Sequence, residues 1–516
     1  LETTSSGINV TGAINVNGAA LSTAPTITAT ANGSISANEA VIVESDGKVA
    51  GITAIADTTT SSTNLVQTAN NTYGPRYLQT AWDDANNTVV AIWLEHTGYA
   101  GESRINVAAG TLSGNTLTWG SNVVVYANNA KWPQVASLGG NKYILTYSKV
   151  PESDSYGRIA TVSGTTVTLH GETQSGVSNT MNDTDLIALS SSRAILAYAH
   201  NSTDDNYIKV IQISGNTVSF GSAQICASGN ANGGHNRLTK LSSTKFLWTY
   251  YRAPYVTVYG RVCEVAGGAT SATLGAEALF IDNKGASHLT IYDPVKDQGA
   301  FIWQHSQRTD KICALRWNFT GTTLTVQTST ITNDLLTGDY DQFQLQGDIS
   351  TTSDIFITAK NSSGSPSNQG EYFKLVQNGD TFTASNVTAN FSNNDGVMST
   401  VAEHQSSVPL LVGNGQFLIL WGSYKSGANY LRYFVRQYPA TDLTNENFIG
   451  FASAAYSNGA TATINVTGNT TTQSSLTPGQ KYFVQNDGSL ALTAADPSVA
   501  AGRALTSTKL LINTGD

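Results

Sequence analysis

The chain has 516 residues, of which 12% are charged and 40% are hydrophobic, and its formal net charge is −9 at pH 7. An acidic chain without a basic cluster excludes recognition of nucleic acid through its phosphates, so no nucleic-acid partner is expected. No apolar run reaches the roughly 18 residues of a membrane-spanning helix, so no membrane insertion is expected either. Abundant Gly, Ser, Thr and Asn between alternating Val, Ile, Thr and Tyr predict an all-β fold.

Residues 1–24 contain two short alternating segments, closed by turns at Gly12 and Gly18. They carry too little apolar surface to fold alone. Two interpretations stay open. The segment is either shaft-like, with several chains wrapped together as in a fibre, or it is an irregular linker.

A hairpin with Asp46-Gly47 at its turn is predicted in residues 25–60, and a hairpin of the same form has Asp487-Gly488 near the C-terminus. Two related hairpins from opposite ends of the chain indicate one small β domain, residues 25–60 plus 441–516. The intervening residues 61–440 are then an inserted domain. Insertion requires its two ends to lie close together, and a closed ring provides this.

The inserted region repeats a short apolar strand seven times, at 90–93, 143–147, 195–198, 246–250, 300–303, 355–359 and 417–421. Successive copies lie about fifty residues apart, a period typical of β-propellers and related arrays. Six of the seven strands end in an aromatic residue: Trp93, Tyr147, Tyr198, Tyr250, Trp303 and Trp421. We expect these rings to pack between neighbouring repeats.

Each repeat divides into four strands, which in the first are 77–81, 89–94, 103–108 and 117–126. A turn containing glycine joins the last two strands and recurs at 113–116, 163–166, 214–217, 320–323 and 378–381. Glycine supplies the positive φ that such a hairpin needs. Four-stranded antiparallel sheets repeated in this way are propeller blades.

The seventh repeat lacks its outer strand, and a candidate precedes the first repeat. Residues 63–71 (TNLVQTANN) match 121–129 (SNVVVYANN) in residue type at most positions. We therefore expect a seven-bladed β-propeller closed by this N-terminal strand, which hides two sheet edges. Both flanks then leave the ring on the face that carries the glycine hairpins, and the opposite face is free.

Candidate binding residues cluster where the second strand of each repeat ends on that free face. Two residues past each strand marker stand Glu95, Lys149, His200, Arg252, His305, Asn361 and Ser423. Tyr99, Tyr156, Tyr207, Tyr251, Tyr255 and Tyr424 nearby offer flat surfaces suited to a sugar ring or a protein loop. The alternative interpretation is that each is an ordinary solvated loop end. For the face as a whole, a binding role is the prediction, because scaffolded loops commonly carry function.

The sequence predicts neither a metal site nor a cofactor. Cys226, Cys263 and Cys313 are too far apart in sequence for a zinc site, and the last two read as small buried side chains. His96, His200 and His305 end strands of different repeats, which splay apart. The acidic loops at 183–185 and 204–206 lack the twelve-residue calcium-loop pattern.

Enzyme motifs are also missing, so the protein is not expected to be an enzyme. The sequence has no HExxH, no phosphate-binding glycine loop and no GxSxG elbow. The sialidase-type repeat SxDxGxTW has only a distant counterpart in 113–119 (SGNTLTW). A carboxylate pair at hydrolytic spacing is a three-dimensional property and stays open at this stage.

The flanks resemble a known class of proteins. Residues 447–452 (NFIGFA), 476–484 (LTPGQKYFV) and 501–512 (AGRALTSTKLLI) resemble a module of tailed-bacteriophage virion structural proteins. Residues 4–12 (TSSGINVTG) resemble tail-fibre and appendage proteins, especially of marine phages. The likeness covers about a quarter of the chain, and the repeats resemble only propellers in general.

This resemblance implies a protein of the virion surface, either a trimeric fibre or an appendage, in contact with other virion proteins. The expected function is host attachment, in which the free propeller face binds a surface glycan or protein. One alternative is a capsid-decorating or tail-structural assembly protein, and another is a polysaccharide-degrading spike. A cellular surface adhesin is a third.

Overall fold

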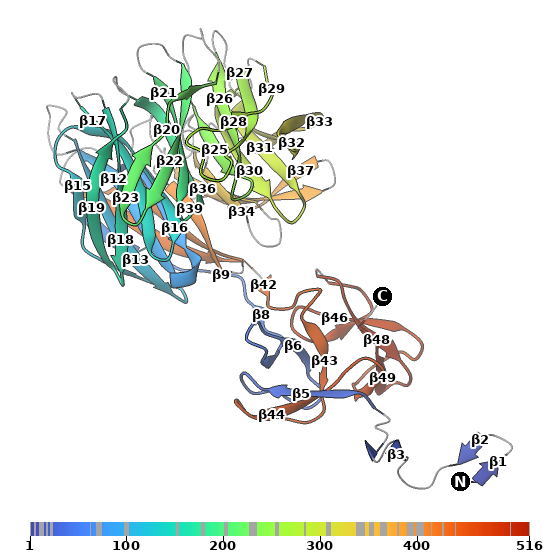
Figure 1. Ribbon diagram of the computed structural model, residues 1–516. Helices are drawn as coiled ribbons and strands as arrows, with labels where there is room; N and C mark the ends of the chain where they lie inside the picture. The colour runs from blue at the N-terminus through green and yellow to red at the C-terminus, as the bar shows by residue number, and fades with distance from the viewer. Residues whose placement is uncertain are drawn as a thin grey trace. The chain divides into compact units, whose positions relative to one another are not determined.

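A computed structural model of the chain describes every residue except 1, 5–6, 10–14, 17–18, 21–23, 62, 69–74, 97–102, 151–153, 177–180, 201–204, 227–234, 253–256, 283–284, 306–310, 337–345, 350–354, 362–368, 379–380, 390–396, 399–406, 414, 426–427, 439, 496 and 515–516. Near several of these ranges it describes the backbone alone. The prediction of an all-β fold is confirmed (Figure 1). Among the described residues the one helical element is a single 3₁₀ turn, η1 (Asp84–Asn86), and no helix is long and apolar enough to cross a membrane.

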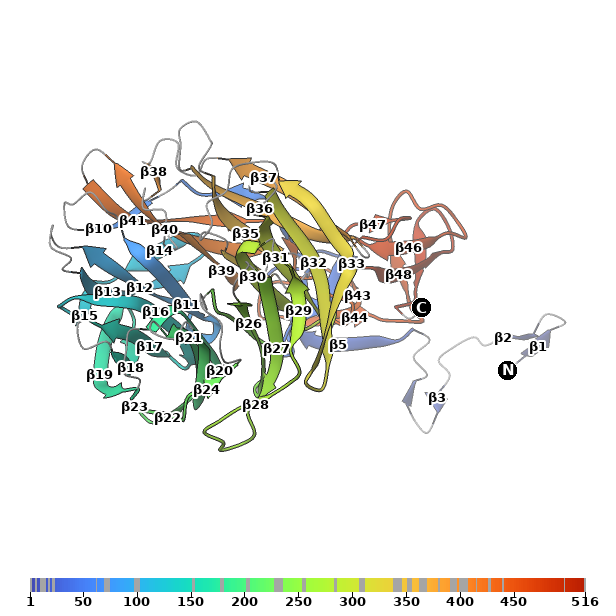
Figure 2. The same cartoon turned by 90° about the horizontal axis from the view of Figure 1, so that it is seen from above.

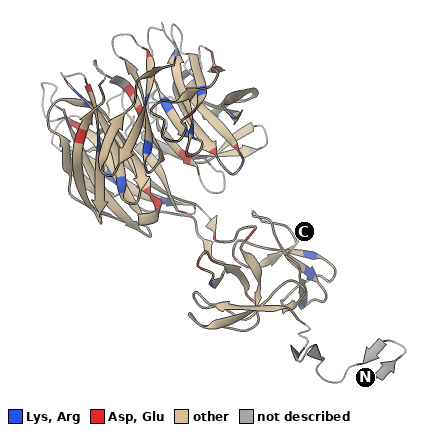
Figure 3. Ribbon diagram, in the orientation of Figure 1, with Lys and Arg blue, Asp and Glu red and all other residues tan. Residues whose placement is uncertain are grey.

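The chain divides into two compact units. The terminal unit comprises residues 1–57 and 438–516, and the central unit comprises residues 58–437. Lys, Arg, Asp and Glu are sparse and scattered in both units (Figure 3). Each unit is described by itself below.

The terminal unit contains two five-stranded antiparallel sheets. The first, here called the split sheet because both chain ends contribute to it, has the order β5-β44-β43-β6-β7, with β5 (Thr26–Thr30), β6 (Ala40–Val43), β7 (Val49–Gly51), β43 (Phe448–Ala452) and β44 (Thr461–Asn465). The second, the C-terminal sheet, has the order β45-β49-β48-β46-β47, with β45 (Thr470–Thr472), β46 (Lys481–Val484), β47 (Leu490–Ala491), β48 (Val499–Ala504) and β49 (Lys509–Ile512). Both predicted Asp-Gly hairpins are present, as β6–β7 and β46–β47.

The two sheets have the same strand order and the same turns. Asn38 and Gly479, which precede the equivalent strands β6 and β46, both adopt a left-handed conformation with φ of 64° and 83°. The backbone N–H of Asn38 donates a hydrogen bond to the carbonyl of Ala452, and the N–H of Gly479 donates in the same way to the carbonyl of Ala504. The terminal unit therefore holds two copies of one module, and residues 58–437 interrupt the first copy between its third and fourth strands.

The two copies share one hydrophobic core. It contains Ala40 and Ile42 of the split sheet together with Val484, Leu510 and Ile512 of the C-terminal sheet, all nearly inaccessible to solvent. Four shorter strands complete the unit as isolated pairs. These are β1 (Glu2–Thr4) with β2 (Gly7–Asn9), and β3 (Asn15–Val16) with β4 (Ala19–Ala20). A further pair, β8 (Ala54–Ile55) with β42 (Ala440–Thr441), lies at the two points where the chain leaves the unit.

The central unit consists of consecutive antiparallel sheets, here numbered 1 to 7. Sheet 1 comprises β11 (Arg76–Asp83), β12 (Thr88–His96), β13 (Ser103–Ser113), β14 (Thr116–Trp119) and β15 (Val123–Tyr126). Sheet 2 comprises β16 (Ala130–Gly139), β17 (Lys142–Lys149), β18 (Asp154–Ser163) and β19 (Thr166–Gln174). Sheet 3 comprises β20 (Met181–Ser190), β21 (Arg193–His200), β22 (Asn206–Ser214), β23 (Thr217–Phe220) and β24 (Gln224–Ile225).

The remaining sheets follow the same plan. Sheet 4 comprises β25 (Arg237–Lys240), β26 (Lys245–Arg252), β27 (Thr257–Glu264), β28 (Thr273–Leu274) and β29 (Ala278–Ile281). Sheet 5 comprises β30 (Gly285–Asp293), β31 (Gln298–His305), β32 (Lys311–Thr320) and β33 (Thr323–Leu336). Sheet 6 comprises β34 (Gln346–Ile349), β35 (Ile355–Asn361), β36 (Gln369–Asn378) and β37 (Thr381–Ala389).

Sheet 7 combines strands from both ends of the unit. It comprises β9 (Thr58–Thr59), β10 (Thr63–Thr68), β38 (Val397–Met398), β39 (Ser407–Gly413), β40 (Gln416–Lys425) and β41 (Ala428–Gln437). Both β9 and β10 pair with β41 in antiparallel register, and Thr58 lies opposite Gln437. The chain therefore enters and leaves the central unit at one point of sheet 7.

The first four strand-joining hairpins with glycine are confirmed, because Gly114, Gly164, Gly215 and Gly321 have φ between 55° and 63°. The fifth, at 378–381, lies partly outside the described residues. The outer strand differs from the prediction, since 117–126 forms two strands, β14 and β15. A side chain at Gly120, which lies in this break, would meet the carbonyl oxygen of Thr165 in the next sheet's hairpin at 2.1 Å. The break lets the two sheets approach each other.

Neighbouring sheets share hydrophobic cores. Clusters of buried residues join sheets 1 and 2, 2 and 3, 3 and 4, 4 and 5, and 5 and 6. Phe356 of sheet 6 stacks on Phe417 of sheet 7 with ring centroids 4.4 Å apart. Another cluster joins sheet 7 to sheet 1. The innermost strands β11, β16 and β20 follow one another in this order (Figure 2), β25 contacts β20, and β39 contacts β11.

The six strand aromatics are buried, as expected. Trp93 packs in the cluster shared by sheets 1 and 7, and Tyr147 in the cluster shared by sheets 1 and 2. Tyr198, Tyr250 and Trp303 lie in the next three shared clusters. The prediction that these rings pack between neighbouring repeats is confirmed for those five. Cys263 and Cys313 are buried, as predicted, and Cys226 is buried as well; all three are free thiols.

Candidate functional site

The seven polar positions predicted from the repeats occupy one register. Each lies where the second strand of its sheet ends, away from the glycine hairpins: Glu95, Lys149, His200, Arg252, His305, Asn361 and Ser423. We call them the strand-end positions. The structure thus places them at equivalent points of the seven sheets.

Glu95 of sheet 1 is bound within its own sheet. Its side chain is buried, and the Oε2 atom accepts hydrogen bonds from Arg104 Nε at 2.8 Å and from Asn106 Nδ2 at 2.6 Å. Both donors stand on β13. Glu95 therefore holds two strands together and presents little of its charge to solvent.

Lys149 of sheet 2 is enclosed by aromatic rings and a carboxylate. Its Nζ atom lies 2.6 Å from Glu172 Oε1, 3.8 Å from the centre of the Tyr156 ring and 4.7 Å from the centre of the Tyr126 ring. The Tyr147 hydroxyl donates a hydrogen bond to the other oxygen of Glu172. Cation–π contacts and the ion pair together compensate the burial of this ammonium group.

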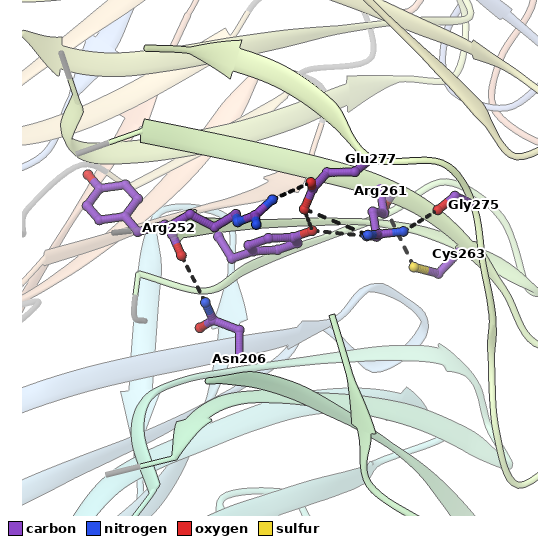
Figure 4. Close-up of polar contacts among 8 residues, drawn as sticks. Asn206, Arg252, Arg261, Cys263, Gly275 and Glu277 are labelled. Carbon is purple, nitrogen blue, oxygen red and sulfur yellow. Dashed lines mark hydrogen bonds and ion pairs between the residues drawn. The ribbon is translucent and has the colours of Figure 1, made fainter. Parts of the chain in front are cut away.

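Sheet 4 repeats this arrangement at the equivalent residues (Figure 4). Glu277 receives a hydrogen bond from the Tyr250 hydroxyl at 2.6 Å and one from Arg252 Nη1 at 2.7 Å. Arg261 Nη2 lies 3.8 Å from the same carboxylate, and Arg261 Nε donates to the Tyr250 hydroxyl at 3.0 Å. We call these two groups, Tyr147–Lys149–Glu172 and Tyr250–Arg252–Glu277, the paired clusters.

The carboxylates of the paired clusters were missed in the sequence, although a signal was present. Glu172 and Glu277 follow Tyr147 and Tyr250 by 25 and 27 residues, and Arg158 and Arg261 stand at one register of the third strand. Aligning the second and fourth repeats over their outer strands would have found all four residues.

Burial and hydrogen bonding shift the protonation of the sheet 2 cluster. Burial raises the pKa of the Tyr147 hydroxyl above its usual value, and the hydrogen bond to Glu172 adds to this effect. Burial alone would raise the pKa of Glu172, but the bonds from Lys149 and Tyr147 hold that pKa below its usual value. The cluster is therefore an ion pair with a neutral phenol near pH 7, a state suited to structure and recognition rather than to proton transfer.

The other predicted residues vary in what the structure describes. The His200 ring is half-buried and lies 6.0 Å from the Tyr207 ring, and the half-buried Tyr156 covers Lys149. Tyr251, expected to offer a flat surface on this face, is buried between the rings of His235 and His288. For His305, Asn361, Ser423 and Tyr424 the backbone alone is described, and Tyr99 and Tyr255 lie outside the described residues.

In the part of the chain that the structure describes, no group of three or more His, Cys, Asp or Glu could hold a metal ion. The chemistry available at the strand ends is that of ion pairs, phenol hydroxyls and aromatic rings.

Comparison with known proteins gives similarity of fold alone. No known protein family and no curated protein matches the sequence. Among solved structures, the chain is similar to the periplasmic gluconolactonase of Pseudomonas aeruginosa, with 10% identity over 72% of this chain and 97% of that chain and a TM-score of 0.43. It is also similar to a Dyadobacter fermentans protein (9% identity, 74% and 98% covered, TM-score 0.44) and to the WD40 domain of SCAP from fission yeast (11% identity, 75% and 98% covered, TM-score 0.37). At these values no function is transferred.

Proposed function

We propose that the central unit is a seven-bladed β-propeller in which β9 and β10 complete the last blade. The pairing of both strands with β41 supports this proposal, as does the core shared by sheets 7 and 1. β9 and β10 also divide the outer strand of sheet 7 as β14 and β15 divide that of sheet 1. Closure in this way covers the edge of β41, which would otherwise be open to association.

We further propose that the protein belongs to the surface of a tailed-phage particle and mediates host attachment without performing chemistry. The observation that carries this proposal is the pairing of Thr58 with Gln437. Both connections of the central unit leave sheet 7 at the end that corresponds to the glycine hairpins of the other sheets. The strand-end positions lie at the opposite ends of the sheets, which carry no covalent connection to the terminal unit. Such an arrangement suits a head displayed for binding, with the terminal unit joined to other virion proteins.

The strand ends offer what recognition of a glycan or protein requires. They combine ion pairs with tyrosine rings on a scaffold of buried sheets, and multiple copies on one particle would multiply a weak affinity. No step of bond cleavage is proposed for this face.

The decisive experiment combines location with competition. Antibodies against the central unit, applied to intact particles, are expected to label the particle surface. The purified protein, added to cells before the particles, is expected to reduce their adsorption. Particles without label, or adsorption that is unchanged at saturating protein, would overturn the proposal.

A further inference from the structure

Four residues in consecutive sheets share an unusual backbone conformation. Tyr77, Trp132, Asp183 and His235 have φ of 50°, 54°, 44° and 48°, in the left-handed region that residues other than glycine rarely adopt. Each stands two residues before the first regularly paired residue of its innermost strand: Gln79, Gln134, Asp185 and Arg237. We call these four residues the left-handed arc.

Buried donors hold this conformation in place. Gln134 Nε2 donates to the Thr184 carbonyl at 2.7 Å, and Thr184 Oγ1 donates to the Trp132 carbonyl at 3.4 Å. Asn236 Nδ2 donates to the Asp183 carbonyl at 3.2 Å. Gln134, Thr184 and Asn236 are themselves buried. The left-handed conformation recurs in four sheets, and buried donors fix it at Trp132 and Asp183. Backbone strain of this kind clusters at functional sites.

A second layer fixes Asn236. Its Oδ1 atom accepts a hydrogen bond from Trp248 Nε1 at 2.9 Å, and its Nδ2 atom also donates to Asn206 Oδ1 at 2.9 Å. Asn206 in turn donates to the Tyr251 carbonyl at 3.0 Å (Figure 4). The arc is therefore preorganised, because its backbone has little freedom left to lose on binding.

The side chains of the arc combine aromatic and polar groups. The Tyr77 and Trp132 rings meet edge to face with centroids 4.7 Å apart. All four side chains are half-buried, so each keeps part of its surface in solvent. Burial lowers the pKa of His235 to about 4, so its imidazole is neutral near pH 7.

We propose that the left-handed arc is a subsite for a neutral sugar ring. Because the Tyr77 and Trp132 rings meet edge to face, one ring stacks against the apolar face of the sugar and the other contacts its edge. The Asp183 carboxylate and the His235 imidazole bind its hydroxyls. The proposal rests on the attachment function and names its ligand class. An acidic sugar fits less well, because the Asp183 carboxylate repels it. The nearby Arg237 is already engaged, since it donates to the Asn236 carbonyl and faces the Asp185 carboxylate.

The left-handed backbone provides a sharp test. Glycine adopts this conformation without strain, so Tyr77→Gly and Trp132→Gly remove a ring while relieving the backbone. Asn87→Gly is the matched control, since Asn87 is exposed, left-handed with φ of 49°, and precedes β12 at the other end of β11. Asp183→Asn keeps both the size of the side chain and its tolerance of left-handed φ, so it tests the site without loss of packing.

The intact protein is titrated with neutral oligosaccharides of glucose, galactose, mannose and N-acetylglucosamine, and with uronic-acid oligomers, by calorimetry. We expect the wild type to bind a neutral oligomer. Tyr77→Gly, Trp132→Gly and Asp183→Asn should each weaken that binding about tenfold, and Asn87→Gly should leave it unchanged. Wild-type protein that binds no neutral oligomer or prefers the uronic acids would overturn the proposal. So would three arc variants that bind like the wild type.

Cell binding separates this proposal from the one on which it rests. If the wild type and all three arc variants bind cells equally well, the attachment function stands and the arc is not the sugar subsite. If the wild type itself does not bind cells, the attachment function fails. Thermal melting of each variant, followed by tryptophan fluorescence, verifies that the central unit is folded in each comparison.

Discussion

The Asp348 carboxylate in β34 accepts a hydrogen bond of 2.8 Å from the backbone N–H of Leu411 in β39, which ties sheet 6 to sheet 7. Its other oxygen accepts the N–H of Ile349 at 2.8 Å. Burial raises the pKa of Asp348 to about 6, and the two backbone hydrogen bonds offset this only in part. Asp185 links sheets 3 and 4 in the same way, because its carboxylate accepts a hydrogen bond of 2.7 Å from the backbone N–H of Leu238.

Asp348 is expected to make the central unit less stable as the pH rises. Between pH 4 and 6 the unfolded chain has released a proton that the folded protein still holds, so raising the pH through this window favours unfolding. The full difference corresponds to about 3 kcal/mol above pH 6. Asp348→Asn should remove this dependence. Urea unfolding at pH 4 to 7, followed by fluorescence, measures it, because all eight tryptophans lie in the central unit. Asp84→Asn, at an exposed carboxylate, is the control and should leave the pH dependence unchanged. If the free energy of unfolding changes with pH equally in the wild type, Asp348→Asn and Asp84→Asn, the prediction is wrong.

Glu277→Gln is expected to destabilise the central unit more than Glu172→Gln. Glu277 binds Tyr250, Arg252 and Arg261, and 19% of its side chain is exposed, whereas Glu172 is 34% exposed. Losing the counter-charge should cost about 2 kcal/mol for Glu277 and about 1 kcal/mol for Glu172. Glu264→Gln is the control, because Glu264 lies 4.0 Å from Lys245 at the surface of the same sheet and should change stability by less than about 0.5 kcal/mol. Urea unfolding gives all three values, and an equal cost at positions 264 and 277 would refute the assignment.

The repeat period, the second-strand aromatics and the glycine hairpins could be predicted from the sequence because each has a strict local requirement. A buried ring recurs at one register in Trp93, Tyr147 and Tyr250, and a positive φ recurs at Gly114 and Gly164. The split of the outer strand could not be predicted, since it depends on the approach of Thr165 from the next sheet to Gly120.

The candidate site was predicted less completely, for a similar reason. The strand-end positions follow from counting along each repeat, and the structure places them at equivalent points. Their partners come from the outer strands, as with Glu172 for Lys149, and that pairing is a property of the sheet. The left-handed arc had little local signal, because Tyr77 and Trp132 are not residue types that favour a positive φ.

Gly450→Ala and Gly502→Ala are each expected to destabilise the terminal unit by about 3 kcal/mol or more. The two glycines occupy equivalent positions in β43 and β48, with φ of 150° and 148°, and a Cβ atom at either would lie 2.0 Å from a backbone carbonyl oxygen, that of Asn465 or of Leu511. Gly459→Ala is the control, because Gly459 has φ of 80° but open space around it, so it should lose only about 1 kcal/mol. Circular dichroism follows the melting of the whole chain and tryptophan fluorescence that of the central unit, so a transition seen by circular dichroism alone reports the terminal unit. A change confined to the tryptophan signal of the central unit would contradict the assignment.

The duplicated module explains how the chain tolerates a large insertion. The C-terminal sheet shows that the module folds with a direct connection between its third and fourth strands, β47 and β48. In the split sheet the equivalent connection, between β7 and β43, is interrupted, because the chain enters the central unit after residue 57 and returns at residue 438. β8 and β42 pair at this point, with Ile55 opposite Ala440, so the two ends of the connection already lie side by side.

Deleting residues 58–437 is therefore expected to leave a folded terminal unit. The remaining connection, Ala56-Asp57-Tyr438-Pro439, has the length of a common hairpin loop and would join β8 to β42 in their present register. The shortened protein should show a β-type circular dichroism spectrum and a cooperative thermal transition, and it has no tryptophan to obscure the tyrosine signal. Adding Gly502→Ala should lower its melting temperature as it does in the full chain. A shortened chain without a cooperative transition would mean that the two copies of the module need the central unit in order to fold, and the view of the central unit as an insertion would then be wrong.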